Sequence, residues 1–460
     1  MSPPGPAGPA GAAGRAAATD PVAADLLPLT ARIADDGRLS IGGVDLCDLA
    51  AEPGPSGPLS GGSGPSGPLS RGQGTPLFVY DETHLRTRCR EAVAAFGPGV
   101  AYASKAFLCV AMARLVHEEG MHLDVATGGE LHVALAAGVP PADLKLHGNN
   151  KSLAELRRAR ELGVRLVVDS FDELDRLERL HSADGITAEV LIRVTPGVEA
   201  HTHEYVMTGQ VDSKFGFGLA CGDAARAVER VAGSPATEVV GLHCHIGSQI
   251  FLSHSFAKAV ETMADFVRPL GLPELCVGGG LGVPYVAGEQ APSISEWATV
   301  VHDACRRAGI DARVTAEPGR SIVATAGLTL YRVGTIKEIA GVRTYVSVDG
   351  GMSDNPRPVL YGSGYEAFLP RAAGAERPRV ATVVGKHCES GDLVVRDAHL
   401  PADVAVGDVL CTPVTGAYGH SMASNYNKVT RPAVVFVADG RARVVVRRES
   451  LDDLLGLDEV

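Results

Sequence analysis

The chain has 460 residues, 45% of them apolar, which is enough for two domains with sizeable cores. Its formal net charge of −12 at pH 7 argues against nucleic acid and anionic membrane surfaces as partners. The nine cysteines show no paired spacing, no apolar run approaches the roughly 18 residues of a membrane span, and no signal-peptide pattern opens the sequence. We therefore expect a soluble cytoplasmic protein with no membrane partner.

Two stretches near the N-terminus are too rich in small residues and proline to bury a core. Residues 1–24 are predicted to form a disordered tail. Residues 25–80 contain short β-rich runs, and residues 53–74, in which "GPSGPLS" occurs twice, are interpreted as a disordered insertion between these runs. The strand material of this N-terminal segment is expected to pack with the domain at the other end of the chain.

Residues 81–334 alternate β-rich and helical runs. Eight such pairs are the number expected of a (β/α)8 barrel, and a doubly wound sheet is the alternative. The strand-like runs are VAYASKA, MHLDVAT, LKLHGNN, RLVVDS, EVLIRVTP, VVGLHCHIGSQ, ELCVGGGLG and ARVTAEPGRSIVA. Because the eight units follow one another without interruption, we predict a TIM-like (β/α)8 barrel of the α/β class.

Residues 335–460 have almost no helical pattern. Runs such as RTYVSVDGG and AVVFVADGRARVVVRRE read as strands, and Asp439-Gly440 marks a tight hairpin between two of them. We predict a C-terminal β-sandwich or β-barrel domain that is completed by the N-terminal strand material.

Polar residues stand at the C-terminal ends of all the predicted barrel strands, where barrels of this kind carry their active sites. In chain order they are Lys105, Asp124, His147, Asn149, Asn150, Asp169, Ser170, Arg193, His243, His245, Ser248, Gly278 to Gly280, Glu317 and Arg320. One polar residue at a strand end carries little information. Such residues at the same end of every strand predict an active site.

The last two predicted strands end in turns that suit a phosphate group. Residues 278–280 are three glycines, whose N–H groups can approach an anion closely, and Arg320 follows in "EPGRS". A lysine at a strand end more often reaches water than reacts. Together with a phosphate site and the acid Glu317, however, Lys105 indicates pyridoxal phosphate, whose aldehyde condenses with an amine and whose ring accepts electrons.

His243 and His245 could share one face of a strand and bind a metal ion. Such a site needs a third and a fourth ligand, and no carboxylate or cysteine stands at a supporting spacing. We therefore predict no metal site.

Motifs from about residue 75 to the end of the sequence resemble those of the bacterial diaminopimelate decarboxylases, which belong to the alanine-racemase-like and ornithine-decarboxylase-like class of pyridoxal-phosphate enzymes. They include YASKA, LDVATGGEL, HGNNKS, GLHCHIGSQI, GGGLGVPY, EPGRSIVA, VDGGMSDNPRPVLY, GKHCESGD and GAYGHSMASNYN. The resemblance implies decarboxylation of meso-2,6-diaminopimelate to L-lysine and CO₂, the last step of bacterial lysine biosynthesis, by a homodimer with shared active sites.

The resemblance also implies a role for each matching residue. Lys105 would bind the cofactor covalently, and Cys388 would donate a proton from the other subunit. The implied cofactor-binding residues are Lys105, Asp124, His245, Ser248, Gly279, Gly280, Glu317, Gly319, Arg320 and Tyr418. The implied substrate-binding residues are Arg320, Arg357, Tyr361, Glu389 and Tyr418.

Arg357 is the clue to the substrate, because a guanidinium group binds a carboxylate through two parallel hydrogen bonds. The closest alternative is a decarboxylase of ornithine, arginine or another amino acid. Simple basic substrates have no distal carboxylate and would want an acidic residue at this position. A racemase would need a tyrosine base in place of Cys388, and a non-catalytic regulatory protein of the same fold need not keep Lys105.

Overall fold

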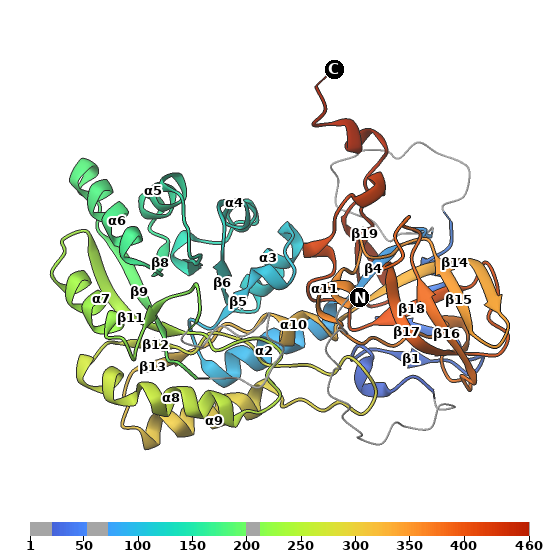
Figure 1. Cartoon of the computed structure of the whole chain (residues 1–460), viewed down its shortest axis with the longest axis horizontal. Coiled ribbons are helices and arrows are strands. Elements are labelled where there is room, and N and C mark those ends of the chain that lie inside the picture. Colours follow the sequence, from blue (N-terminus) through green and yellow to red (C-terminus); the bar gives the residue numbers. More distant parts are fainter. Residues whose placement is uncertain (1–20, 53–71, 199–211, 460) are drawn as a thin grey trace, which may run out of the picture.

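The computed structural model describes residues 21–52, 72–198 and 212–459, which form a helix-covered barrel beside a β domain (Figure 1). The predictions of disorder for residues 1–20 and 53–71 lie outside the described residues. Both predicted stretches also include a few residues that the structure describes. Val22, in the first stretch, is buried, and the N–H of Gly74, in the second, donates to the Ala51 carbonyl at 2.9 Å. No helix among the described residues is both long and apolar enough to cross a membrane.

The barrel has eight parallel strands, as the sequence predicts. They are β5 (Ala101–Ala103), β6 (His122–Val125), β7 (Leu144–Leu146), β8 (Arg165–Val168), β9 (Ala188–Thr195), β11 (Thr237–Cys244), β12 (Glu274–Cys276) and β13 (Arg313–Thr315), with β10 (Phe217–Gly218) beside β9. The Ala101 N–H donates to the Ala316 carbonyl at 2.9 Å and the Ala103 N–H to the Pro318 carbonyl at 3.1 Å. These two bonds join the first strand to the segment after the last, so the sheet closes.

Helices follow the strands and cover the outside of the barrel (Figure 1). Serine and glutamate three residues apart form capping boxes at Ser152 and Ser293, which fixes where two of the helices begin. The helices are α2 (Glu82–Phe96), α3 (Val110–Glu118), α4 (Gly128–Ala136), α5 (Leu153–Leu162), α6 (Phe171–Asp184), α7 (Asp223–Ala232), α8 (His254–Val267), α9 (Ile294–Arg307) and the short α10 (Arg320–Val323).

The β domain contains strand β4 (Leu77–Asp81), which precedes the barrel in sequence. This strand lies between β14 and β19, antiparallel to the first and parallel to the second. The other elements are β14 (Gly327–Ile339), β15 (Arg343–Val348), α11 (Arg357–Tyr361), β16 (Arg379–Val384), β17 (Leu393–Leu400), β18 (Val409–Pro413), β19 (Ala433–Ala438) and β20 (Arg441–Val446). The prediction of a β domain completed by N-terminal strand material is confirmed.

The hairpin between β19 and β20 turns at the predicted dipeptide, where Asp439 has a φ of 51° and Gly440 a φ of 71°. Earlier in the chain lies β1 (Arg32–Ile33), whose two residues are exposed. After it, β2 (Leu39–Ile41), β3 (Val44–Asp45) and α1 (Leu46–Leu49) share an apolar cluster with β14 and β18. The predicted domain boundary after residue 334 falls inside β14. The exact division of the chain into domains stays a prediction.

A buried ionic cluster lies inside the barrel, below its mouth. Lys145 on β7 donates to Glu274 on β12 at 3.0 Å, and these strands are not neighbours, so their side chains meet in the interior. Thr315 donates to the same carboxylate at 2.8 Å, Arg313 at 2.5 Å and Arg165 at 3.2 Å. Burial by itself raises the pKa of Glu274, but Lys145 and its other partners bring it below its usual value.

We expect Glu274→Gln to destabilise the protein by about 3–5 kcal/mol, because it leaves the buried Lys145 ammonium without its carboxylate. A carboxylate whose pKa is lowered on folding stabilises above its unfolded pKa, and this stabilisation is lost as the pH falls through the folded pKa. The difference in free energy of unfolding between wild type and variant should therefore be largest at pH 7 and decrease below about pH 4. Urea denaturation at both pH values, followed by circular dichroism, measures this.

Glu189→Gln is the matched control, because Glu189 pairs with Arg165 at 3.1 Å but its side chain is 55% exposed. We expect a loss of at most about 1 kcal/mol for this variant. Equal urea midpoints for the two variants at pH 7 would contradict the assignment of a buried ion pair at Glu274.

Candidate active site

A pocket opens at the end of the barrel where the C-terminal ends of the strands meet. The structure brings together there all ten residues that the resemblance implies for the cofactor: Lys105, Asp124, His245, Ser248, Gly279, Gly280, Glu317, Gly319, Arg320 and Tyr418. The pocket is completed by Ala103, His147, Arg193 and His243. One contributor, Tyr418, comes from the β domain, so the pocket lies between the two parts of the chain.

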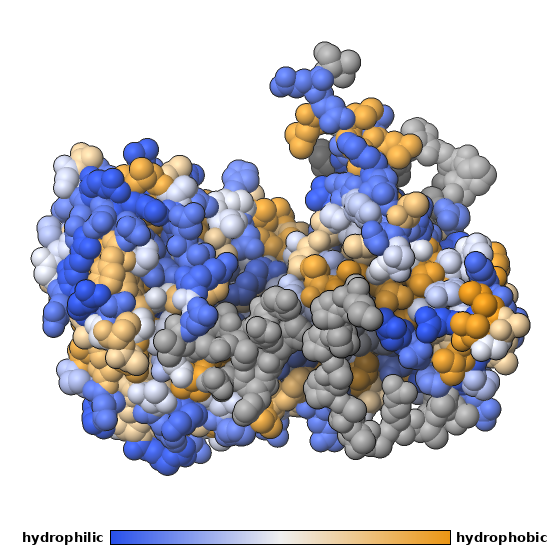
Figure 2. Space-filling model, viewed as in Figure 1, coloured by the Kyte–Doolittle hydropathy of each residue, from blue (hydrophilic) through white to orange (hydrophobic). Residues whose placement is uncertain are grey.

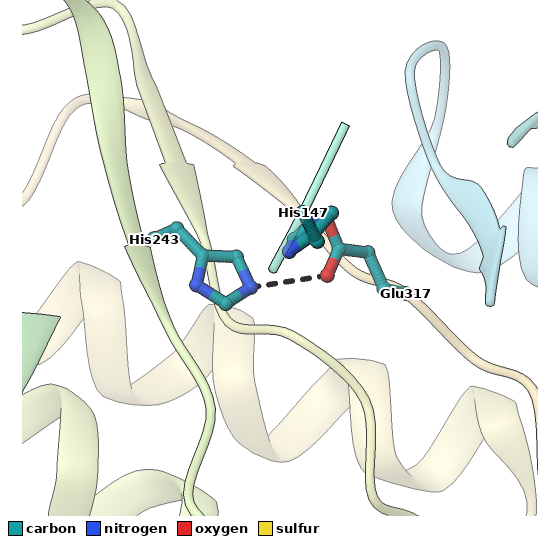
Figure 3. Close-up of side chains that lie close together, drawn as sticks. All are labelled: His147, His243 and Glu317. Carbon is teal, nitrogen blue, oxygen red and sulfur yellow. Dashed lines mark hydrogen bonds and ion pairs between the residues drawn. The ribbon is translucent and has the colours of Figure 1, made fainter. Parts of the chain in front are cut away.

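Glu317 is the buried carboxylate at the centre of the pocket. The His147 Nε2 lies 3.1 Å from one of its oxygens and the His243 Nε2 lies 3.0 Å from the other (Figure 3). Burial by itself raises the pKa of Glu317, but the two histidines outweigh it and hold that pKa well below its ordinary value. Glu317 is therefore ionised at neutral pH although it is only 4% exposed.

His243 is neutral in this arrangement. Burial, partly offset by Glu317, lowers its pKa to about 4. A neutral imidazole that donates from Nε2 has an unprotonated Nδ1, and the Nδ1 of His243 is buried without a hydrogen-bond partner among the described residues. The carboxylate of Glu317 therefore receives an N–H from this ring without gaining a second charge.

Lys105 lies directly after β5, in the short helix η2 (Ser104–Ala106). The Lys105 side chain is exposed to solvent only because it faces the pocket, and protein atoms line that pocket around it. Burial lowers the pKa of the amine, but the neighbouring Asp124, Tyr418 and Glu317 together raise it above its ordinary value. Lys105 is therefore an ammonium group, facing two acids, when no ligand has reacted with it.

His245 presents a neutral ring to the pocket. Burial, together with the nearby charges of Lys105 and Arg193, lowers its pKa well below the ordinary value. The Gly279 N–H donates to its Nδ1 at 3.2 Å, which places the ring proton on Nε2. An uncharged, fixed imidazole of this kind can stack against a planar ligand.

Two glycines after β12 lie where no side chain would fit. A Cβ added to Gly279 would be 2.2 Å from the Glu317 carbonyl oxygen, and one added to Gly280 would be 2.1 Å from the Gly247 carbonyl oxygen. Gly280 also has a φ of 112°, which side-chain-bearing residues rarely adopt. The backbone at this corner is therefore bare, and a phosphate group could approach it closely.

The group of residues that could bind a metal ion differs from the histidine pair that the sequence suggested. His243 gathers with His147 and Glu317, rather than with His245, and one ligand atom from each lies within 4.8 Å of the others. These three groups already satisfy one another by hydrogen bonds, with histidine N–H groups donating to the carboxylate. The absence of a metal ion from this site stays a prediction.

The remaining predicted residues lie outside the pocket lining. Arg357 is buried and donates to the Tyr365 hydroxyl at 2.9 Å, and Tyr361 is half-buried at the end of the same short helix. Cys388 and Glu389 are exposed in the turn between β16 and β17. The Cys388 N–H donates to the Asn427 side chain at 3.2 Å.

Sequence reasoning noted His147, Arg193 and His243 as polar residues at strand ends but gave them no role. Their position at strand ends was the feature of the sequence that could have assigned them to the pocket. Tyr285, the last residue of GGGLGVPY, and Tyr365 lie beside Arg357 but were given no role, because nothing in a linear sequence links a barrel loop to the β domain.

Three comparisons place this geometry among known proteins. Residues 82–324 match the family described as "Pyridoxal-dependent decarboxylase, pyridoxal binding domain". The chain is 48% identical over 407 residues to the diaminopimelate decarboxylase of Mycobacterium tuberculosis, covering 84% of this chain and 91% of that protein. It is 44% identical over 450 residues to the diaminopimelate decarboxylase of Bacillus subtilis, covering 93% and 97%.

A solved structure agrees with these sequence relatives. The diaminopimelate decarboxylase of M. jannaschii in complex with L-lysine superimposes with a TM-score of 0.83 at 32% identity, covering 94% of this chain and 98% of the other. The match extends over both the barrel and the β domain. This chain belongs to the diaminopimelate decarboxylase family of pyridoxal-phosphate-dependent enzymes.

Proposed function

We propose that this enzyme decarboxylates meso-2,6-diaminopimelate to L-lysine and CO₂, as the last step of lysine synthesis. The observation that carries the proposal is the pocket itself, in which a lysine amine, an ionised carboxylate and a bare glycine corner face one another. These three features match the aldehyde, the ring nitrogen and the phosphate of pyridoxal phosphate. The family membership and the L-lysine complex of the M. jannaschii relative support the same substrate.

Different residues of the pocket have different roles toward the cofactor. Pyridoxal phosphate, when bound, supplies an aldehyde that condenses with amines and a ring that accepts the electron pair left by departing CO₂. Lys105 would provide the amine that holds the aldehyde until an amine of the substrate takes its place. Glu317, held ionised by His147 and His243, would keep a proton on the ring nitrogen, and the neutral His245 would lie against the ring.

Gly279, Gly280 and Ser248 would hold the phosphate at the glycine corner. The Ser248 hydroxyl already accepts a hydrogen bond from Arg320 at 2.9 Å, so a cation stands beside that corner. Gly319 leaves no room for a larger residue, because an added Cβ would be 2.9 Å from the Ala103 side chain. We assign Asp124 a place beside Lys105, whose pKa it raises, while burial raises the pKa of the Asp124 carboxyl group itself.

The substrate is recognised by its carboxylates and its distal amine. Arg320 and Arg357 bind carboxylates, with Tyr361 and Tyr418 beside them, and Glu389 binds the distal ammonium group. A guanidinium group prefers a carboxylate, and this preference favours a substrate with a distal carboxylate over ornithine or lysine.

The proton that replaces CO₂ comes from Cys388, which we place in the active site of a second subunit. The exposure of Cys388 and Glu389, away from the pocket of their own chain, supports a homodimer with shared sites. The C-terminal segment that projects from the β domain also exposes Leu451, Leu455 and Leu457 (Figure 2). Apolar side chains on such a segment suit a subunit interface.

We place the reaction in the cytoplasm. All nine cysteines lie in the described residues and are free thiols, which is in keeping with a reducing compartment. The thiol of Cys388 would remain available there as a proton donor.

Substrate choice is tested by CO₂ release from the purified enzyme with added pyridoxal phosphate. Supplied separately with meso-diaminopimelate, L-ornithine, L-arginine and L-lysine, the enzyme should release CO₂ only from the first and form L-lysine. Arg357→Met should lower kcat/KM for diaminopimelate by about 10- to 100-fold, because it removes a charge-assisted hydrogen bond. Release from a basic amino acid by the wild type would overturn the assignment of Arg357.

Shared active sites are tested by mixing two inactive variants. Lys105→Ala lacks the attachment amine and Cys388→Ala lacks the proposed acid, so each homodimer should be inactive. Unfolded together and refolded, they should form heterodimers in which one of the two sites is intact, with up to about a quarter of wild-type activity in a statistical mixture. If heterodimers form, as shown by differently tagged subunits, and no activity returns, the sites are not shared.

A further inference from the structure

One side-chain oxygen holds the turn that carries Cys388. This turn joins β16 to β17, and both Cys388 and Glu389 are exposed in it. The Cys388 N–H donates to the Asn427 Oδ1 at 3.2 Å, and this is the one hydrogen bond that Cys388 makes among the described residues. The position of Cys388 therefore depends on a side chain that lies 39 residues further along the chain.

The same oxygen also faces the residue before Cys388. The His387 Nδ1 lies 3.2 Å from the Asn427 Oδ1, and the Nε2 of the same ring lies 2.8 Å from the Ser353 Oγ. Because the Cys388 N–H can only donate, the amide atom that faces it is the oxygen, and the His387 Nδ1 at that oxygen carries a proton. His387 is only 8% exposed, and its ring packs on Tyr426 with centroids 5.3 Å apart. Asn427 thus fixes the Cys388 backbone and a buried ring beside it.

A second acceptor, Asp392, holds the base of the turn. Its Oδ2 accepts from the His387 N–H at 2.9 Å and its Oδ1 from the Met352 N–H at 2.6 Å. These bonds tie the turn to the segment around Met352 but stop short of Cys388. Of the described side chains, only that of Asn427 forms a hydrogen bond with Cys388 itself.

The backbone at Asn427 does not need the asparagine side chain. Asn427 lies in the short turn η8 (Tyr426–Lys428) with a φ of 53° and a ψ of 25°, a left-handed conformation that glycine adopts without strain. The loop around it is held by Asn425, whose Nδ2 donates to the Val429 carbonyl at 3.0 Å and to the Glu449 carboxylate at 2.6 Å. What the Asn427 side chain adds is the contact with the turn that carries Cys388.

We propose that Asn427 is a positioning residue, which holds Cys388 where its thiol can donate a proton in the active site of the other subunit. The inference rests on the proposed function and adds to it the residue that orients the acid. A proton donor must lie within hydrogen-bond reach of the atom that it protonates, and a displacement of about 1 Å can slow a reaction about 100-fold. An amide oxygen suits this role, because it fixes the backbone without adding a charge beside the thiol.

The test compares two variants of the holoenzyme with meso-diaminopimelate as substrate. Asn427→Gly removes the acceptor but suits the backbone, whereas Asn427→Asp keeps an oxygen for both donors. We expect Asn427→Gly to lower kcat about tenfold or more with KM changed less than about threefold, and Asn427→Asp to stay within about threefold of wild type. Asp439→Gly is the matched control, because Asp439 is also exposed and left-handed, at a φ of 51°, but lies in the β19–β20 hairpin. It should change neither constant.

Mixing subunits shows whether Asn427 acts through Cys388. Asn427→Gly, unfolded and refolded together with Lys105→Ala, should form heterodimers with one intact site and reach up to about a quarter of wild-type activity in a statistical mixture. Refolded with Cys388→Ala, it should show no more than its own residual activity, because both variants then lack a correctly placed acid. A defect in the pocket of the Asn427→Gly subunit itself would give the opposite pattern.

That opposite pattern, with recovery from Cys388→Ala but not from Lys105→Ala, would overturn the positioning role. An unchanged kcat in Asn427→Gly would overturn it as well, and so would an Asn427→Asp as slow as Asn427→Gly. Sedimentation of Asn427→Gly as a monomer, where the wild type is a dimer, would assign Asn427 to subunit assembly instead. Failure of the wild type to release CO₂ from diaminopimelate would overturn the proposed function, whatever the variants show.

Discussion

The ionised Glu317 carboxylate is the interaction on which the rest of this site depends. A carboxylate buried to 4% exposure would ordinarily take up a proton, but two histidine nitrogens at 3.0 and 3.1 Å keep it charged. Because His243 stays neutral, this histidine adds no positive charge that would cancel the charge of Glu317. That charge is what a protonated ring nitrogen requires, and it also helps to keep the Lys105 amine protonated before the cofactor arrives.

The hydrogen bonds that close the barrel determine where the Glu317 carboxylate lies. The segment after β13 supplies the Ala316 and Pro318 carbonyls that accept hydrogen bonds from β5, and Glu317 stands between them. Arg320 begins α10 three residues later, and Lys105 follows β5 on the other side of the same seam. The bonds that close the sheet therefore also set the spacing between the reactive amine, the acid and the guanidinium group. The Lys145–Glu274 pair lies below, in the interior of the same barrel.

Much of this could be predicted from residues at strand ends, because parallel strands in a closed barrel deliver their last residues to one place. The β4 strand and the Asp439-Gly440 turn followed from local pattern. What local pattern cannot supply is contact between distant segments. The pairing of Tyr285 with Arg357, and of His147 with Glu317, depends on the closed barrel and on the β domain packed against it. Alternation of side chains along a strand could not tell which histidine would turn toward Glu317.

The charge on Glu317 can be measured directly by infrared difference spectroscopy between the wild-type protein and Glu317→Gln, from about pH 5 to about pH 8. A folded-state pKa well below the ordinary value predicts a carboxylate band for Glu317 at every pH in this range, with no band from a protonated carboxyl group. A protonated carboxyl band at about pH 5 that disappears as the pH rises would contradict the account. It would show that burial of Glu317 outweighs its two histidine partners.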